Sequence, residues 1–281
     1  MRVSVISTGT VRIRPDHVEG RGVPVFWWLL TSRRWTAPRP INVFVIEHPT
    51  ALVLFDTGQD RRSVTDAAYF PRGIVGFLYR RLARFSIAAG ETLPALLADR
   101  GYDIGAVRYA VLSHLHQDHI GGLRDLRHAE IVVSDVEWRQ VSRRTAVLDG
   151  YLADHILLPA SRVTRVTPVS TEDPSIAPFA EAHDLLGDGS LLLVPTPGHS
   201  PGSLSLLLRR DGEPPLLFVG DLTYDVELLA EGRVPGVGSR SGLRASSRLV
   251  AEFVERNPGT VVLAAHDPAA AALLADASVV R

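Results

Sequence analysis

The chain has 281 residues, a formal net charge of −1 at pH 7, and hydrophobic side chains at 46% of its positions. This is an ordinary globular composition with enough residues for a sizeable core, and its balanced charge favours neither nucleic acid nor an anionic membrane as a partner. The sequence contains no cysteine, which excludes disulfide bonds and thiolate metal ligands. No stretch has the roughly 18–20 apolar residues of a membrane span, and the N-terminal apolar run is too short for a signal peptide. We therefore expect a cytoplasmic protein.

The sequence pattern of the first part of the chain predicts β-strands, separated by a less regular segment. An opening strand is expected over residues 3–7, and the apolar runs 41–46 and 51–55 have the pattern of a β-hairpin. The segment before the hairpin contains two adjacent tryptophans, Trp27 and Trp28. They fit either the protein core or an apolar wall beside a binding cleft.

Residues 59–86 are rich in arginine, and apolar residues recur in their second half at helical spacing: Ile74, Phe77, Leu78, Leu82 and Phe85. Three roles remain open for this segment. It can be a surface helix with a solvated arginine face, a helical lid or dimer-contact insertion beside an active site, or a helix that binds calmodulin-like partners or a membrane surface. Further helices are expected over residues 91–100, 135–144 and 243–256.

A dense cluster of metal-ligand residue types, Ser113-His114-Leu115-His116-Gln117-Asp118-His119, follows the apolar run 109–112. A short apolar run of this kind is typical of a buried strand, so the cluster is expected at a strand end, where layered α/β proteins tend to place their chemistry. Imidazoles and carboxylates are ligands that zinc prefers. Residues two apart in an extended loop point the same way, so His114 and His116 can share one metal ion. Asp118 and His119 are adjacent and break this every-second-residue pattern, so they can face a second metal ion.

Three more residues of these types each come soon after a strand-like apolar run: His199, Asp221 and His266. A single histidine after a strand is most often an ordinary loop residue, but three such residues in order at strand ends are unlikely to arise by chance. The other histidines lack this strand-end context and are expected at the surface: His17, His48, His128, His155 and His183.

The form His-x-His-x-Asp-His at residues 114–119, with these later residues in order, resembles the signature of the metallo-β-lactamase superfamily. The resemblance implies a layered α/β protein, a four-layer αββα sandwich. No linker or strong internal repeat divides the sequence, so residues 1–281 are expected to form one domain, in which residues 59–86 can be a helical lid or dimer insertion. The resemblance also implies two divalent metal ions, with zinc favoured and iron, manganese or cobalt tolerated by nitrogen and oxygen ligands. The first ion would be held by His114, His116 and His199, the second by Asp118, His119 and His266, and Asp221 would bridge both. Asp56, in Phe55-Asp56-Thr57-Gly58, would orient a metal-binding histidine.

Tyr224 stands three residues after Asp221, as in the N-acyl-homoserine lactonases of this superfamily. This resemblance implies a small-molecule lactone substrate, opened by a hydroxide that bridges the two metal ions, and a role in quorum quenching. Tyr224 would donate a hydrogen bond to the substrate carbonyl as it becomes an oxyanion, and Asp118 would carry a proton to the departing ring alkoxide. A homodimer is compatible with the resemblance. Gln117 departs from it, because many of these lactonases have an aromatic residue at that position.

Two other functions fit the same residues. One is a different hydrolase on the same scaffold, either a glyoxalase-II-like thioesterase or a phosphodiesterase. The other is a binding protein that keeps the metal site, has lost turnover and acts as a sensor. A nuclease of the superfamily would need a basic surface and usually an extra domain, and the sequence offers neither.

Overall fold

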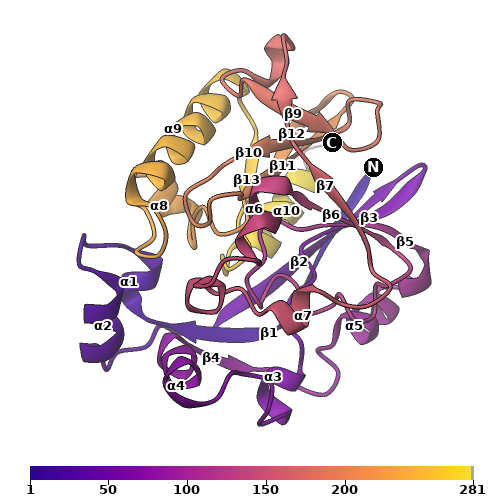
Figure 1. Ribbon diagram of the computed structural model, residues 1–281. Coiled ribbons are helices and arrows are strands. Elements are labelled where there is room, and N and C mark those ends of the chain that lie inside the picture. Colours follow the sequence, from indigo (N-terminus) through magenta and orange to yellow (C-terminus); the bar gives the residue numbers. More distant parts are fainter. Residues whose placement is uncertain (280–281) are drawn as a thin grey trace.

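Two β-sheets packed face to face form the centre of the structure, a computed structural model that describes residues 1–279 (Figure 1). The first sheet has the strand order β4-β1-β2-β3-β5-β6-β7, and the second has the order β13-β12-β11-β10-β9-β8. The strands of the first sheet are β1 (Arg2–Ile13), β2 (Arg39–His48), β3 (Ala51–Phe55), β4 (Ala83–Ser86), β5 (Val107–Val111), β6 (Glu130–Ser134) and β7 (Arg162–Val166). Those of the second are β8 (Val169–Ser170), β9 (Glu181–Asp184), β10 (Leu191–Pro195), β11 (Leu204–Arg210), β12 (Glu213–Phe218) and β13 (Val261–Leu263).

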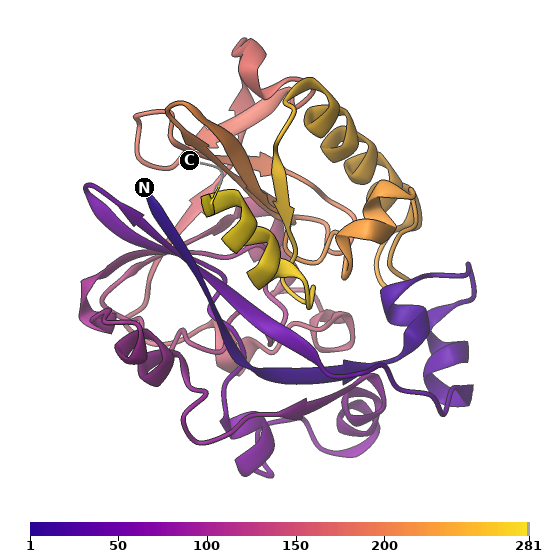
Figure 2. The ribbon, with the colours of Figure 1, turned by 180° about the vertical axis from the view of Figure 1, so that it is seen from behind.

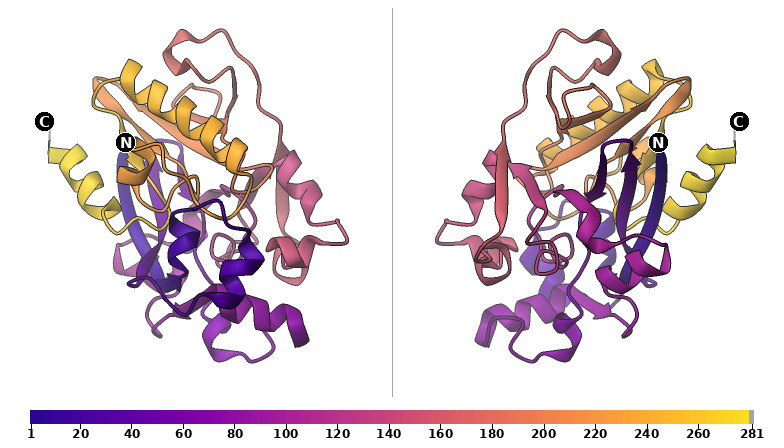
Figure 3. Two further views of the ribbon diagram at one scale, coloured as in Figure 1. Left: turned by 90° about the vertical axis from the view of Figure 1, so that its left-hand side faces the viewer. Right: turned by 90° about the vertical axis from the view of Figure 1, so that its right-hand side faces the viewer.

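Helices cover the outer faces of both sheets. The α-helices are α1 (Pro15–Val18), α2 (Val25–Thr31), α3 (Arg62–Thr65), α4 (Gly73–Leu82), α5 (Leu93–Asp99), α6 (Asp135–Gln140), α7 (Ala153–Ile156), α8 (Val226–Ala230), α9 (Arg240–Arg256) and α10 (Ala270–Val279). Helix α5 packs on the first sheet, and α9 lies along the outside of the second (Figure 3). Helix α10 contacts β1 and β13 at one side of the sandwich (Figure 2). The predicted four-layer αββα sandwich is confirmed.

The central strands β2, β3, β10 and β11 are largely buried on both faces, and the side chains of β2 alternate between two apolar layers. On β2, Val43 and Val45 pack toward α5, whereas Phe44 and Ile46 pack between the sheets. The Phe44 ring lies 4.9 Å, between ring centroids, from Phe218 of the opposite sheet. Truncating such a buried phenylalanine to alanine typically costs about 3–5 kcal/mol. Contacts of this kind hold the two sheets, and therefore the loops at their ends, in one fixed arrangement.

The segment 59–86 differs in one respect from its prediction. Helices α3 and α4 are present, but residues 83–86 form the strand β4 and pair with the end of β1, so Phe85 does not continue the helical face. The physical reason is that β2 pairs with one edge of β1 only, so backbone groups on the other edge of β1 are free to pair with residues 83–86. Tertiary pairing therefore overrides the helical spacing of the apolar residues.

The two adjacent tryptophans have opposite environments on the short helix α2. Trp28 is buried, whereas Trp27 is 66% exposed. One tryptophan therefore belongs to the core, and the other lies on the outer surface of a helix that contacts α4. Within residues 1–279, no helix is both long and apolar enough to cross a membrane.

Five strands end at the same side of the sandwich, and the predicted site residues follow them. β3 and β5 run parallel in the first sheet, and β12 and β13 run parallel in the second. The carboxyl ends of parallel neighbours meet at one edge, which brings the loops after β3, β5, β12 and β13 together with the loop after β10.

Candidate metal centre

The imidazole rings of His114, His116 and His199 lie close together beside the loop that follows β5. The Nδ1 atom of His116 lies 3.0 Å from Nε2 of His114 and 2.9 Å from Nε2 of His199. His114 and His199 are buried, and His116 is half-buried. The loop after β5 supplies two of these side chains, and the loop after β10 supplies the third. The structure therefore brings together the three residues expected around a first metal ion.

A second group of donor atoms lies beside the first. Nε2 of His266 is 3.5 Å from Oδ2 of Asp118, and Nε2 of His119 is 3.8 Å from Oδ1 of Asp118. His119 and His266 are buried, and Asp118 is half-buried. These are the three residues expected around a second ion, and their ligand atoms are close enough to share one.

The carboxylate of Asp221 stands between the two groups. Its Oδ1 lies 3.3 Å from Nε2 of His119 and 3.5 Å from Nε2 of His266, and its Oδ2 lies 3.6 Å from Nε2 of His199. One oxygen therefore faces each group. This is the placement expected of a carboxylate that bridges two metal ions.

The donor atoms fit a divalent metal pair because two of them are buried without a hydrogen-bond partner in the described part of the chain. Nε2 of His119 and Oδ1 of Asp221 are buried and have no hydrogen-bond partner among residues 1–279. A buried polar atom without a partner is costly, and a buried anion is more so. Coordination of a cation would satisfy both atoms together.

The electrostatic field of the site also favours a cation. Burial lowers the pKa of His114 and His199 well below the usual histidine value, so both imidazoles are neutral at pH 7. Burial opposes a charge on His119 as well, but the carboxylates of Asp221 and Asp56 outweigh it and raise the pKa of His119. A field that stabilises a proton at this nitrogen also stabilises a metal ion there.

Most of the converging imidazoles are held by a second hydrogen bond on the ring nitrogen that faces away from the site. These partners are the Ser113 hydroxyl for His114, the Asp149 carbonyl for His116, the Asp56 carboxylate for His119 and the Pro40 carbonyl for His266. Such contacts fix the ring orientation and the tautomer of metal-binding histidines. The donor set is therefore organised by the protein itself.

Asp56 has the orienting position that its sequence context suggests. Its Oδ2 accepts hydrogen bonds from Nδ1 of His119 at 2.8 Å and from the Ser113 hydroxyl at 2.9 Å, and its Oδ1 accepts one from the Ser113 backbone N–H. The backbone of Asp56 is left-handed, with φ of 61°, an arrangement that costs of the order of 1–3 kcal/mol outside glycine. The three hydrogen bonds compensate for that strain and connect the ends of β3 and β5.

Glu137 of α6 is a site residue that the sequence reasoning missed. Its side chain is fully buried, with no cationic partner among residues 1–279. Its Oε1 accepts a hydrogen bond from the Leu115 backbone N–H, and its Oε2 accepts from the Ser200 hydroxyl and the Gly202 N–H. Leu115 stands between His114 and His116, and Ser200 follows His199. A Cβ on Gly202 would lie 2.2 Å from the Glu137 backbone nitrogen, so only glycine permits this approach. Glu137 therefore ties together the two loops that supply the first histidine group.

Replacing Glu137 with glutamine is expected to weaken this connection. A glutamine amide offers one acceptor oxygen, so in either orientation its NH2 group faces a backbone N–H. The expected results are a loss of about 2–3 kcal/mol in the free energy of unfolding and a 10–100-fold weaker metal affinity. Denaturant unfolding and metal titration measure the two effects. Glu255→Gln, an exposed position on α9, is the matched control and should change neither.

Tyr224 lies in the same cluster of side chains. Its hydroxyl donates a hydrogen bond to Oδ2 of Asp221 at 2.6 Å, and its ring stacks on that of His266 with centroids 5.4 Å apart. Burial and the charge of Asp221 raise the pKa of Tyr224 well above its usual value, so the phenol keeps its proton at neutral pH. The Arg39 guanidinium donates to the backbone carbonyls of Tyr224 and His266, and this contact was not evident from the sequence.

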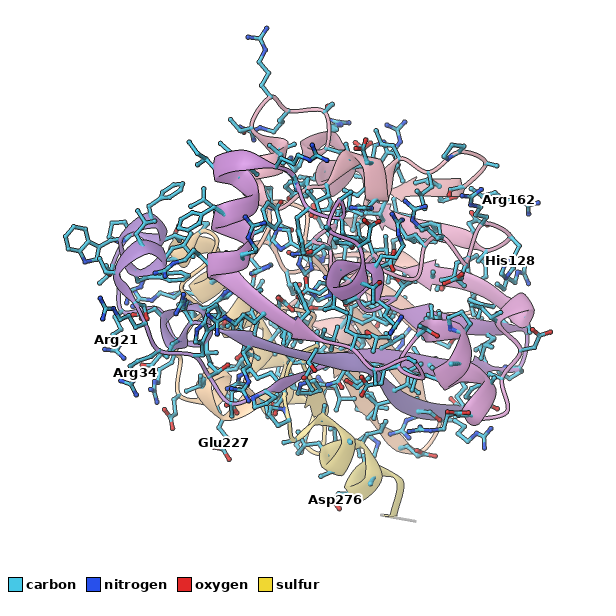
Figure 4. The ribbon with its side chains drawn as sticks, turned by 90° about the horizontal axis from the view of Figure 1, so that it is seen from below. Arg21, Arg34, His128, Arg162, Glu227 and Asp276 are labelled. Carbon is cyan, nitrogen blue, oxygen red and sulfur yellow. The ribbon has the colours of Figure 1, made fainter. Side chains whose placement is uncertain are left out.

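The expected surface position of His17 is wrong. His17 is 7% exposed, and its Nε2 lies 2.9 Å from the Tyr224 hydroxyl oxygen. Burial lowers its pKa to about 4, so the imidazole is neutral at pH 7. His155 is half-buried and stacks on Tyr69, whereas His128 lies at the periphery of the molecule (Figure 4). No motif surrounds His17, and only the folded chain brings it to Tyr224.

Comparisons with known proteins agree with this architecture. A family model described as the Metallo-beta-lactamase superfamily matches residues 36–266. The chain is 29% identical over 234 residues to an N-acyl homoserine lactonase AttM of Rhizobium radiobacter, covering 82% of each chain. It is also 29% identical over 243 residues to the Probable metallo-hydrolase Rv2300c of Mycobacterium tuberculosis, covering 81% of this chain and 74% of that protein.

Among solved structures, the fold is similar to that of an N-acyl homoserine lactone hydrolase with the product N-hexanoyl-L-homoserine bound at its catalytic metal centre. The TM-score is 0.75 at 20% identity, over 95% of this chain and 93% of the other. At this identity the likeness concerns the fold alone. The family match over most of the chain and the shared sandwich lead to one conclusion: the chain belongs to the metallo-beta-lactamase superfamily.

Proposed function

We propose that this protein is a hydrolase that uses two divalent metal ions to open lactone rings, with N-acyl homoserine lactones as its substrate class. The observation that carries the proposal is the position of Asp221, whose carboxylate lies between the two histidine groups while its Oδ2 also accepts the hydrogen bond of Tyr224. The name of the Rhizobium radiobacter relative, an N-acyl homoserine lactonase, supports the same substrate class.

Two groups of side chains would hold the ions. His114, His116 and His199 would bind the first ion, and Asp118, His119 and His266 the second. Asp221 would contact both. We propose zinc as the metal, because the ligands are neutral imidazoles and carboxylates, a set that iron, manganese or cobalt can also use. When bound, such a pair supplies Lewis acidity and makes water a nucleophile at neutral pH.

Tyr224 would stabilise the charge that develops on the substrate. As water adds to the lactone carbonyl carbon, the carbonyl oxygen gains negative charge, and the Tyr224 hydroxyl turns from Asp221 to donate to it. The phenol is suited to this role because its raised pKa keeps the proton on the oxygen. The buried position of the ring against His266 limits the directions that the hydroxyl can take.

Asp118 would move the proton that the reaction must transfer. A new C–O bond forms between water and the carbonyl carbon, and the ring C–O bond breaks. The water proton passes to the Asp118 carboxylate and then to the departing alkoxide, which leaves as an alcohol. Asp118 suits this task because its side chain is half-buried, whereas the Asp221 carboxylate is buried.

Acid release tests the proposal directly. Each lactone opened yields a carboxylic acid that loses a proton at neutral pH, so a pH indicator follows turnover. Zinc- or cobalt-loaded protein would be given N-acyl homoserine lactones with short and long acyl chains, simple lactones, a glutathione thioester and a phosphodiester. We expect turnover of the acylated lactones and little of the others.

The same panel separates the competing functions. If protein of measured metal content hydrolyses none of the lactones, the lactonase proposal is contradicted. Turnover of the thioester or the phosphodiester in its place would assign that activity to the site. If metal-loaded protein hydrolyses none of the substrates, a binding protein that acts as a sensor is favoured.

We further propose that α2 and α4 form a contact surface between two copies of the chain. Large apolar side chains are exposed on both helices: Phe26, Trp27 and Leu30 on α2, and Ile74 and Phe77 on α4. The helices contact each other, so these residues lie on neighbouring elements (Figure 1). Because burial of exposed apolar side chains favours association, Trp27→Glu is expected to reduce the mass measured by light scattering from two chains to one.

Leu157→Glu is the matched control for this prediction, because Leu157 is also exposed but follows α7. It should leave the mass unchanged. A wild-type protein that stays at the mass of one chain at all concentrations would refute the dimer.

A quorum-quenching role and a cytoplasmic location belong to the same proposal. Cells that produce the protein should remove added N-acyl homoserine lactones from their medium. Cell fractionation would test the location, and recovery of the protein outside the cytoplasmic fraction would contradict it.

A further inference from the structure

An imidazole from the N-terminal part of the chain contacts the hydroxyl of Tyr224. His17, which precedes Tyr224 by 207 positions, lies with Nε2 2.9 Å from the hydroxyl oxygen. The two rings meet edge to face, with centroids 5.1 Å apart and an angle of 70° between the ring planes. Tyr224 is thus held between His17 and the stacked ring of His266.

The backbone fixes His17 in this position. Its carbonyl accepts a hydrogen bond from the Gly236 N–H, and the Gly20 N–H donates to the Val234 carbonyl. A Cβ on Gly236 would lie 2.0 Å from the Asp16 carbonyl oxygen, so the two segments can approach only because this residue is glycine. Helix α1 is therefore packed closely against the loop after α8.

A count of protons determines which atom donates to which. The Tyr224 hydroxyl has one proton, and Asp221 Oδ2 at 2.6 Å is an acceptor. The neutral imidazole of His17 must then carry its proton on Nε2 and donate it to the tyrosine oxygen. Nδ1 has no hydrogen-bond partner within residues 1–279, so no contact there requires the other tautomer.

We infer that His17 is a positioning residue, which fixes the direction of the Tyr224 hydroxyl and makes it a stronger donor to the substrate oxyanion. This inference rests on the role proposed above for Tyr224. A phenolic oxygen that accepts a hydrogen bond is polarised and donates its own proton more strongly. When the hydroxyl turns from Asp221 to the substrate, the bond from His17 remains and stabilises the new direction.

A double-mutant cycle tests this role. His17→Leu removes the donor and keeps an apolar side chain, and His17→Gln keeps an N–H group. We expect His17→Leu to lower kcat about tenfold with KM within about twofold of the wild-type value, and His17→Gln to recover most of kcat. In the Tyr224→Phe background, His17→Leu should have no further effect, because no hydroxyl remains for it to position.

Two kinetic outcomes would overturn the inference. One is an equal fall in kcat on His17→Leu in both backgrounds, which would mean that His17 supports the site only by packing. The other is an unchanged kcat on His17→Leu in the wild-type background. Thermal unfolding and metal content, measured on every variant, show that each is folded and loaded.

A measurement without substrate separates this inference from the lactonase proposal. In protein labelled with ¹⁵N-histidine, the resonance lost in His17→Gln identifies His17. We expect its proton on Nε2, and an upfield shift of that proton in Tyr224→Phe. A proton on Nδ1 would overturn the inference even if lactones are hydrolysed. If no lactone is hydrolysed, the proposed function fails, and the same spectrum still decides whether His17 donates its Nε2 proton to Tyr224.

Discussion

Replacing His116 with alanine is expected to remove bound metal and hydrolytic activity together. Nδ1 of His116 lies within 3.0 Å of Nε2 of both His114 and His199, so the variant would leave the proposed first ion with two of its three imidazoles. A catalytic metal contributes several kcal/mol to transition-state stabilisation, and kcat/KM should therefore fall by about 10³-fold or more. Metal analysis by mass spectrometry and lactone hydrolysis would be measured on the same sample.

His128→Ala is the matched control. His128 is exposed, and its Nε2 contacts the Ile104 carbonyl, so metal content and activity should both remain. Retention of metal and activity by His116→Ala would overturn the assignment of His116 as a ligand.

Replacing Tyr224 with phenylalanine is expected to lower kcat while metal content stays unchanged. The hydroxyl is the only atom removed, and no proposed metal ligand is lost. Removal of one oxyanion donor typically lowers kcat by about 10²–10³-fold. Steady-state kinetics on an N-acyl homoserine lactone, with metal content determined in parallel, measures both quantities.

Tyr102→Phe removes a hydroxyl from a tyrosine outside the metal centre, one that bonds to Ser4 and Glu47, and it should leave kcat unchanged. If Tyr224→Phe has the same kcat as wild type, Tyr224 has no role in the chemical step. If it loses metal, the hydroxyl acts on Asp221 rather than on the substrate.

Most of the architecture could be predicted from the sequence because its signals are local. The runs 41–46, 51–55 and 216–219 are apolar at almost every position, which is typical of strands buried on both faces. The structure places all three in the sheets and packs helices outside them. The helical spacing was misleading at Phe85, because residues 83–86 pair with β1, a strand about seventy residues earlier in the chain.

The candidate metal residues could also be found from the sequence. His114, His116, Asp118 and His119 form one short motif, and His199, Asp221 and His266 each follow an apolar run. A residue just after a strand lies at one edge of a sheet, and the resemblance to the metallo-β-lactamase signature indicated which of these residues share a site. Their role as ligands stays a prediction that His116→Ala addresses.

By itself, the sequence determined the buried strands, the residues at their ends and the chemistry those residues can support. Only the tertiary structure decided which side chains hold them in place: Glu137 beneath two loops, Arg39 behind Tyr224 and His17 against its hydroxyl. The reason is physical. A strand is encoded by neighbouring residues, whereas a hydrogen bond between residues far apart in the chain exists only after the sheets have packed and excluded water.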